Sequence, residues 1–547
     1  MLLGVMGLLI GASLTIFGKF GITKSAKAEM IALYASIAAL LWSIFSIAIS
    51  FSPQQNLNTV LPIIPKSSDW NGEPALKLPI SELSSTSASY DLAIKDSAIG
   101  GGYSSPHHFD YLEGIECHPE YAAFDGLTSI FVALTTIISP IAILASEKKT
   151  EMLSSLLLVE ALLLGAFVTF DFVVFYALFE SVLIPMFFLI GGTGSGATVF
   201  RTSAAYRLFI YTLAGSVLML LSLIVLYLEN GTLNWYSLVL NSVYSTSADS
   251  AMLSSTTVQG ITGLASNDVL KSLPLPHYGA ILFPLIFVAF AVKVPMIPVH
   301  LWLPEAHTIA PTPGSMILAA LLLKLGGYGI LRWLMPIFPE GCAYYSPVIL
   351  VLAVISTTFA ALTCLRQIDV KRIVAYSSIV HMNICIYSLF TLNPLAIKGA
   401  IFEMFSHGII STGMFFLIGT VYNRYDTRVL KYFRGLALTM PIFATVFFIF
   451  ILANSAVPLT CGFIGEFVML SGSMAALPAL TLILTLSTIV NAAYNIWLFN
   501  RMCFGGYSPY LVKTKDLTRK EAFVLAPLVF YIFFLGLSPN FIFMFIQ

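Results

Sequence analysis

The sequence predicts an all-α integral membrane protein with about fourteen transmembrane helices. Of its 547 residues, 58% are hydrophobic and only 10% are charged, whereas a soluble globular chain carries roughly 25% charged residues. The mean hydropathy is +0.89. Apolar runs of about 20 residues, the length at which a helix crosses a hydrocarbon core, recur along nearly the whole chain. A water-soluble fold of this length has no interior large enough to bury so much apolar surface.

Fourteen apolar segments are the expected spans. In chain order they are 1–20, 30–52, 124–146, 152–170, 172–192, 208–229, 278–300, 314–336, 346–364, 373–392, 399–422, 437–470, 476–500 and 522–546. The first one lacks a basic leader and a small-residue cleavage site, so we interpret it as a retained span rather than a signal peptide.

Two long segments between the spans are polar. Residues 52–121 are rich in Ser, Pro, Gly and His, and residues 230–276 are rich in Ser, Thr and Asn, with one possible short helix. Neither has enough periodic apolar sequence to bury a core of its own. We therefore expect surface loops, and we divide the chain into the regions 1–123, 124–336, 337–500 and 501–547. The two middle regions are two halves of one helical assembly.

The basic residues predict the orientation of the spans. Of the 27 Lys and Arg residues, nineteen follow odd-numbered spans and six follow even-numbered spans. Because positive charge is retained on the inner side of a membrane, both termini and both long loops should face the outer side. The two basic residues that remain, Lys293 and Lys324, lie inside spans.

The chain shows no sign of a redox centre. Its six cysteines are scattered and form no C-x-x-C pair, so a thiolate metal site or a haem attachment site is not expected. We predict no metal, no bound cofactor and no nucleic-acid partner.

Lys293 lies near the middle of the seventh span, where a lysine costs roughly 2.5–3.5 kcal/mol on insertion scales. Pro295 and Pro298 follow it, and a break in the helix there would free carbonyl groups that need polar partners. Glu180, within the fifth span, is the expected counter-charge. Such a pair can pass a proton, since each charge alters the pKa of the other. The alternatives are a lysine that extends to the membrane interface and a static ion pair that fixes helix packing.

Further ionisable residues lie inside other spans. Lys324 precedes a glycine-rich turn of helix, His381 and His407 are each in mid-span, and Glu403 shares a helix face with His407. Imidazole can relay protons near neutral pH, although each histidine alone could equally be a hydrogen-bonded packing residue.

Glu466 follows Pro458 in the twelfth span and predicts a second broken helix next to a buried charge. Spans seven and twelve are five apart, so the two arrangements would be inverted in the membrane, as in inverted-repeat transporters. Glu160 and His300 are weaker candidates for the same proton relay.

The motifs together resemble a known family. The run VKVPMIPVHLWLPEAHTIAPTPGSMILAALLLKLGGYGILR, followed by RQIDVKRIVAYSSIVHMN and FIGEF, closely resembles the chain 4 family of antiporter-like subunits in the mitochondrial-type, proton-pumping NADH:ubiquinone oxidoreductase, respiratory complex I. The resemblance extends from about residue 124 to the end. It implies fourteen helices, with two inverted five-helix units whose seventh and twelfth helices are broken.

The resemblance also implies a role for each site residue. Glu180 and Lys293 are the interacting pair of the first half-channel, Lys324 is the central link, His381 and His407 are relay groups, and Glu466 is the terminal group. Glu403 departs from the apolar or amide residue expected at its position, which leaves its part in the relay open.

The expected function is proton translocation, from the matrix to the outer side of the mitochondrial inner membrane, as one subunit of an NADH:ubiquinone reductase. NADH, FMN, iron–sulfur clusters and ubiquinone would be bound by partner subunits, and lipids and accessory subunits would surround this chain. A bacterial plasma membrane is the alternative location. The alternative functions are a subunit of a stand-alone Na⁺/H⁺ antiporter complex and a membrane scaffold whose buried charges only pack helices.

Overall fold

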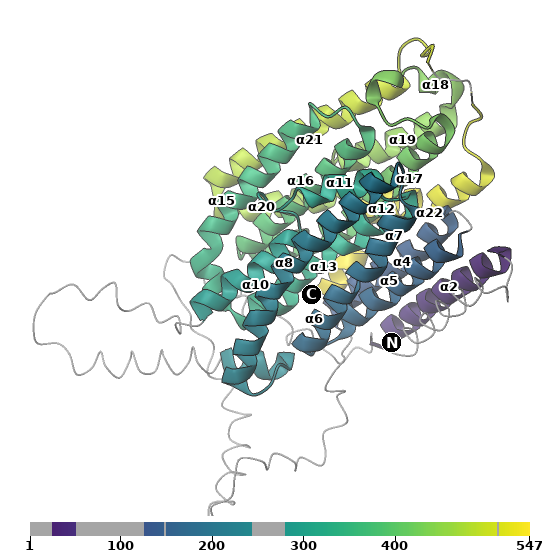
Figure 1. The fold of residues 1–547 in the computed structure, drawn as a ribbon. Coiled ribbons are helices and arrows are strands. Elements are labelled where there is room, and N and C mark those ends of the chain that lie inside the picture. Colours follow the sequence, from purple (N-terminus) through teal and green to yellow (C-terminus); the bar gives the residue numbers. More distant parts are fainter. Residues whose placement is uncertain (1–24, 51–124, 147–148, 243–278, 511–513, 547) are drawn as a thin grey trace, which may run out of the picture. The chain divides into compact units, whose positions relative to one another are not determined.

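The computed structural model describes residues 25–50, 125–146, 149–242, 279–510 and 514–546. These residues form helices that lie side by side (Figure 1), and their only β-pairing is two isolated bridges. Ten of the described helices are long and apolar enough to cross a membrane. The all-α membrane class is therefore confirmed. The predicted span 1–20, the loop 52–121 and most of the loop 230–276 lie outside the described residues, and the division into two halves stays a prediction.

The helices of the first half follow the predicted spans closely. They are α2 (Ser25–Ser50), α4 (Gly126–Ala145), α5 (Thr150–Val168), α6 (Phe172–Ser181), α7 (Leu183–Thr193) and α8 (Thr198–Asn230). Helix α8 begins ten residues before the predicted start and ends at Gly231, whose φ of 70° allows a left-handed cap. A helical stretch at 235–242 agrees with the short helix expected in the second polar segment.

The predicted break in the seventh span is present. Helix α10 (Gly279–Lys293) ends at the lysine itself, and the chain becomes helical again in α11 (Trp302–Ile309). Pro295 and Pro298 have no N–H to continue the helix. The freed backbone groups find side-chain partners: the Trp302 indole donates to the Val292 carbonyl at 3.0 Å, and the Ile297 N–H donates to the Ser356 hydroxyl at 3.0 Å. Lys293 therefore lies at the end of a half-helix rather than within a continuous one.

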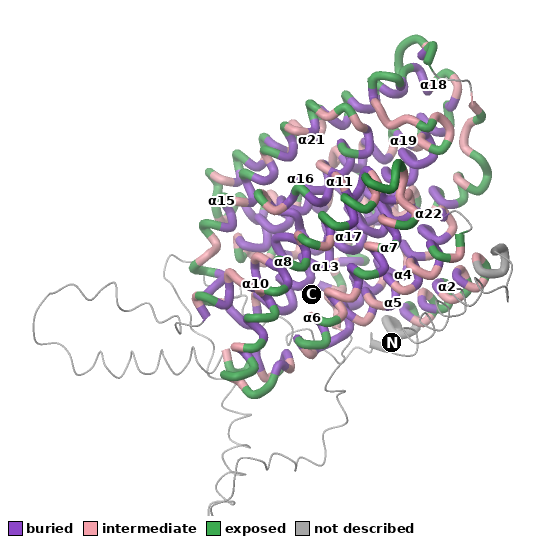
Figure 2. Tube along the Cα trace, in the orientation of Figure 1, coloured by how far each residue is buried: buried purple, intermediate pink, exposed green. Residues whose placement is uncertain are grey.

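Three helical segments form the buried centre of the described unit (Figure 2). One is the nearly continuous run from α12 (Thr312–Ile317) through η3 (Leu318–Leu322), α13 (Leu323–Gly329) and η4 (Ile330–Leu334) to α14 (Met335–Ile337). The others are α16 (Val370–Phe390) and α17 (Pro394–Tyr425). A side chain on Gly329 would overlap the Phe290 ring, so glycine permits the close approach of α10 to this centre.

The second half contains one expected break and one that was missed. Its remaining helices are α15 (Pro339–Cys364), α18 (Leu436–Thr439), α19 (Pro441–Asn454), α20 (Cys461–Ala476), α21 (Pro478–Cys503), α22 (Arg519–Leu537) and α23 (Asn540–Ile546). The predicted span 437–470 is interrupted at 455–460, around Pro458. The prediction of a single last helix at 522–546 was wrong, because the non-helical residues Ser538 and Pro539 separate α22 from α23.

Arg332 also needs a correction. It is one of the six basic residues counted after even-numbered spans, and was thus expected in an outer loop, but it lies in a helix run long and apolar enough to cross a membrane and is only 1% exposed. Its guanidinium donates to Asp125 Oδ2 at 2.8 Å, to the Thr128 hydroxyl at 2.9 Å and to the Tyr328 hydroxyl at 3.2 Å. Lys293 and Lys324 are thus not the only basic residues inside the helical unit. Arg332 holds the start of α4 against η4.

The outer faces of the helices are apolar. Exposed large hydrophobic residues follow one another along α8 and α21, for example Val217, Leu221, Leu486 and Ile489. An apolar outer surface around a centre that contains charged groups is the reverse of a soluble protein and is typical of a chain solvated by lipid. The protein is an integral membrane protein.

Candidate functional site

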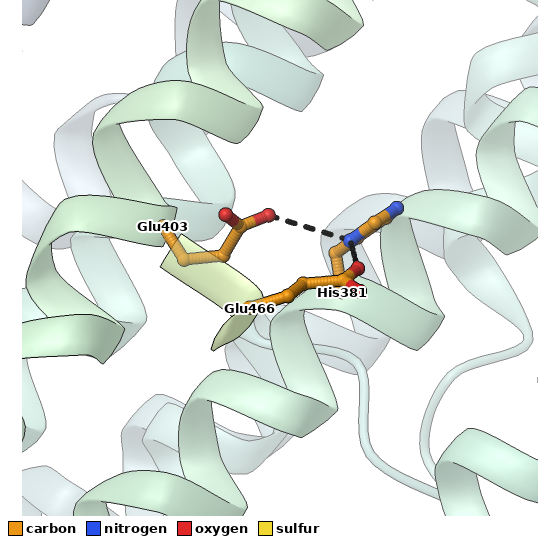
Figure 3. Close-up of side chains that lie close together, drawn as sticks. All are labelled: His381, Glu403 and Glu466. Atoms are coloured by element: carbon orange, nitrogen blue, oxygen red, sulfur yellow. Dashed lines mark ion pairs between the residues drawn. The ribbon is translucent and has the colours of Figure 1, made fainter. Parts of the chain in front are cut away.

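Three buried ionisable side chains meet where α16, α17 and α20 pack together (Figure 3). The Nδ1 atom of His381 lies 3.1 Å from Glu466 Oε1 and 3.4 Å from Glu403 Oε1. His381 is 3% exposed, Glu403 1% and Glu466 6%. Two carboxylates and one imidazole buried side by side must share protons or counter-charge, because isolated buried charges are very costly. We call these three residues the His–Glu cluster.

The local sequence explains why the cluster forms. Helix α16 starts at Asp369, whose carboxylate accepts hydrogen bonds from the N–H groups of Lys371 and Arg372. Helix α20 restarts directly after the break, which places Glu466 in its second turn. Gly465 faces Glu403 so closely that a Cβ atom there would lie 2.9 Å from Glu403 Cβ. Glycine at this position brings the two carboxylates to the same imidazole.

A second contact extends the cluster along α17 towards α13. Lys324 Nζ lies 2.7 Å from His407 Nδ1 and donates to the Ala319 carbonyl at 2.7 Å. The rings of His407 and His381 lie 5.2 Å apart, centroid to centroid. Lys324, His407, His381 and the two glutamates therefore form a continuous series of buried ionisable groups, which we call the central row. The structure brings together four of the six main predicted residues.

Glu180 and Lys293 are neighbours without a direct ion pair, although the structure describes both. The ammonium of Lys293 approaches the Phe179 carbonyl at 3.4 Å and the Phe179 ring centroid at 4.3 Å. Glu180 Oε1 is buried without a hydrogen-bond partner. The pair is thus open in this structure, with the lysine held by the residue next to its expected counter-charge.

The weaker candidates lie apart from the His–Glu cluster. Glu160 on α5 is fully buried, and neither of its carboxylate oxygens has a hydrogen-bond partner. His300 lies in the break after α10, with its ring near Phe359 and Tyr376. Glu403, whose participation was in doubt, is instead a direct contact of His381.

Sequence reasoning missed several buried polar residues. An amide network borders the cluster: Asn491 lies 3.4 Å from His381 Nε2 and donates to the Asn454 carbonyl at 3.0 Å, and Asn454 donates to Asn495 at 3.0 Å. Asparagine is rare in apolar spans, so its presence there was the available signal.

Two further buried residues were missed. The His307 ring stacks on Phe415 at 4.5 Å between centroids. The Lys371 ammonium donates to the Ala310 carbonyl at 2.6 Å.

Comparison with known proteins places this geometry in a family. Residues 169–490 match the family described as NADH:quinone oxidoreductase/Mrp antiporter, TM. The chain is 39% identical over 443 residues to NADH-ubiquinone oxidoreductase chain 4 of Marchantia polymorpha, and the matched region covers 79% of this chain and 83% of that relative. It is 38% identical over 421 residues to NADH-quinone oxidoreductase subunit M of Rhodobacter capsulatus, and this match covers 76% of this chain and 78% of that relative.

A solved structure has the same fold. One chain of respiratory complex I from Thermus thermophilus with bound NADH superposes with a TM-score of 0.73 at 24% identity, covering 100% of this chain and 97% of that chain.

Proposed function

The chain belongs to the NADH-ubiquinone oxidoreductase chain 4 family, and we propose that it translocates protons through the central row as a membrane-arm subunit of complex I. The observation that supports this function is the continuity of the row. From Lys324 through His407 and His381 to Glu403 and Glu466, neighbouring groups are within contact or ring-packing distance. A buried ionisable residue in a membrane protein is expensive, and a connected series of them is the arrangement that a proton relay requires.

Each group in the central row can carry a proton and release it. A lysine and a histidine that share one short contact can exchange a proton, and His381 can pass it on because it faces two carboxylates. Charge on any member alters the energy of charge on the next, since little water screens them. A small displacement of one helix therefore changes the preferred position of the proton along the whole row.

The energy for transport would come from partner subunits. Moving one charge against 100 mV costs about 2.3 kcal/mol, and we propose that NADH, FMN, iron–sulfur clusters and ubiquinone are bound by other chains of the complex. The proposal includes fourteen helices in two inverted five-helix units, a location in the mitochondrial inner membrane, and Glu180 and Lys293 as the proton-entry pair of the first half-channel.

The test replaces Lys324 in the assembled complex. Lys324→Met keeps the length and apolar stem of the side chain but cannot carry a proton. We expect the number of protons pumped per NADH oxidised to fall, while NADH oxidation with an artificial acceptor stays normal and the variant chain still purifies with the complex, which reports intact assembly. Lys398→Met, the same change at a half-buried lysine near the start of α17, is the control and should pump normally. Unchanged pumping in assembled Lys324→Met complex would contradict the proposal.

The same preparation separates the alternative functions. If flavin and NADH dehydrogenase activity do not purify with the chain, the stand-alone Na⁺/H⁺ antiporter becomes the better reading. If Lys324→Met pumps normally but unfolds at a lower temperature, the buried charges serve only to pack helices.

A further inference from the structure

We propose that the His–Glu cluster binds a Zn²⁺ ion, which inhibits transport by occupying the position through which protons pass. The inference rests on the proposed function only for the inhibition, because binding itself is a property of the three side chains. Their ligand atoms, one from each of His381, Glu403 and Glu466, all lie within 4.8 Å of one another.

The spacing suits a tetrahedral ion. Ligands at the usual zinc distances are about 3.4 Å apart across a tetrahedron, and His381 Nδ1 lies 3.1 Å and 3.4 Å from the two carboxylate oxygens. The two carboxylate oxygens lie within 4.8 Å of each other. One imidazole nitrogen and two carboxylate oxygens form the kind of three-residue set that leaves a fourth position for water.

The inward-facing atoms contact one another without a well-formed hydrogen bond. His381 Nδ1 and Glu466 Oε1 are buried and lie 3.1 Å apart, yet neither has a hydrogen-bond partner of acceptable geometry, although most buried polar atoms have one. By contrast, Glu403 Oε2 accepts from the Ser406 hydroxyl at 2.8 Å, and Asn491 lies beside His381 Nε2. These outer contacts orient the ligands and leave Nδ1 and one oxygen of each carboxylate free to face the ion, as second-shell groups do in metal sites.

Charge also favours a divalent ion. In the deprotonated forms that ligate a metal, two carboxylates and a neutral imidazole carry a net charge of −2, which one Zn²⁺ neutralises. Binding would displace the protons held by the cluster. Mg²⁺ fits poorly, because it prefers an octahedral set of oxygens and keeps its water.

The experiment measures binding directly in the assembled complex. After treatment with a chelator, equilibrium dialysis against radioactive Zn²⁺ in excess Mg²⁺ gives the number and affinity of sites for the wild type and for Glu403→Gln and Glu466→Gln. We expect one site to be lost, or its affinity to fall at least about tenfold, in both variants. The matched control is Glu160→Gln, the same change at a buried carboxyl group outside the cluster, and it should bind as the wild type does.

Each outcome decides a separate question. Equal binding in wild type and both cluster variants overturns the inference, since surface sites are common to all of them. A cryo-EM map of wild-type complex in saturating Zn²⁺ is an independent test: density between the three ligands supports the site, and its absence overturns it. If Zn²⁺ binds there without slowing proton pumping, the site stands and the proton route through the cluster is contradicted.

Discussion

His381 presents its two ring nitrogens to different surroundings. Nδ1 faces the carboxylates of Glu403 and Glu466, whereas Nε2 lies 3.4 Å from the amide of Asn491. Asn491 is itself fixed by its bond to the Asn454 carbonyl. The ring therefore has one side that can exchange protons and one side that sets its orientation. Under the proposed function, the position of the His381 ring decides whether a proton can pass between Lys324 and the two glutamates of the central row.

The first prediction tests this geometry by a change that removes no ionisable group. In Gly465→Ala the added methyl group would lie 2.9 Å from Cβ and 3.0 Å from Cα of Glu403, so the helices must separate or the carboxylate must move. Overpacking of this kind costs about 1–3 kcal/mol. A displacement near 1 Å slows a step that depends on alignment on the order of 100-fold. We expect reduced proton pumping with normal NADH oxidation by an artificial acceptor.

The control for Gly465→Ala is Gly191→Ala on α7. There the nearest atom to an added Cβ is Ala205 Cβ at 3.7 Å, an ordinary contact, so pumping should be unchanged. Wild-type pumping by Gly465→Ala would show that the position of Glu403 does not matter to transport.

Sequence reasoning located charged residues better than it judged their surroundings. Lys324, His381, His407 and Glu466 were recognisable because ionisable groups are conspicuous in apolar spans. The direct contact of Glu403 with His381 could not be read from the sequence, because it depends on how closely α20 approaches α17. Arg332 was assigned to a loop because it lies near the end of its span, where composition does not distinguish a buried arginine from a solvated one.

At the scale of elements, the breaks in the seventh and twelfth spans were predictable and the end of α22 was not. Prolines and a nearby charge marked both breaks. Pro539 follows an equally apolar run, yet the segment 522–546 was taken as one helix because its length suits a span. Length and hydropathy thus describe where the chain crosses lipid, but a proline alone does not locate a break, since Pro284 and Pro527 lie inside α10 and α22.

The second prediction concerns the attachment of α22. Arg424 at the end of α17 donates to both carboxylate oxygens of Glu521, at 2.9 Å and 2.6 Å, and also to the backbone carbonyls of Lys515 and Asp516. Glu521 in turn closes a capping box with Thr518. Glu521→Ala removes the side-chain half of the capping box and takes the counter-charge from a mostly buried guanidinium, so we expect a loss of about 1–3 kcal/mol.

The measurement for Glu521→Ala is the thermal unfolding midpoint of the purified complex, together with the rate of proteolysis in the segment before α22. Lys520→Ala is the matched control, because its ion pair with Glu29 at 3.3 Å is half exposed on the lysine side and such pairs contribute little. Equal midpoints for Glu521→Ala and the wild type would show that the bidentate pair does not hold the helix.

At the scale of the whole molecule, the central row and the Glu180–Lys293 pair differ in whether their members contact one another. The central row is continuous within the described residues, whereas Lys293 and Glu180 form a separate pair whose members do not touch each other. A side chain on Gly326 would lie 3.2 Å from Lys293 Cβ, and Lys324 is only two residues before that glycine. Lys293 and Lys324 therefore lie on two closely packed segments. Under the proposed function, this contact is the junction between the Glu180–Lys293 pair and the central row.

The last prediction asks whether the two groups act in series. If a proton must pass both, Lys293→Ala and Glu466→Gln should each remove the whole contribution of this chain to pumping, and the double variant should be no worse than either single one. If the groups serve independent routes, each single variant should remove only a part and the losses should add, as they do for uncoupled sites. The measurement is protons pumped per NADH oxidised in assembled complexes that contain each variant and the double variant. Additive losses would contradict a single row across the molecule. Equal losses in all three variants would support a transport route that includes the junction between Lys293 and Lys324.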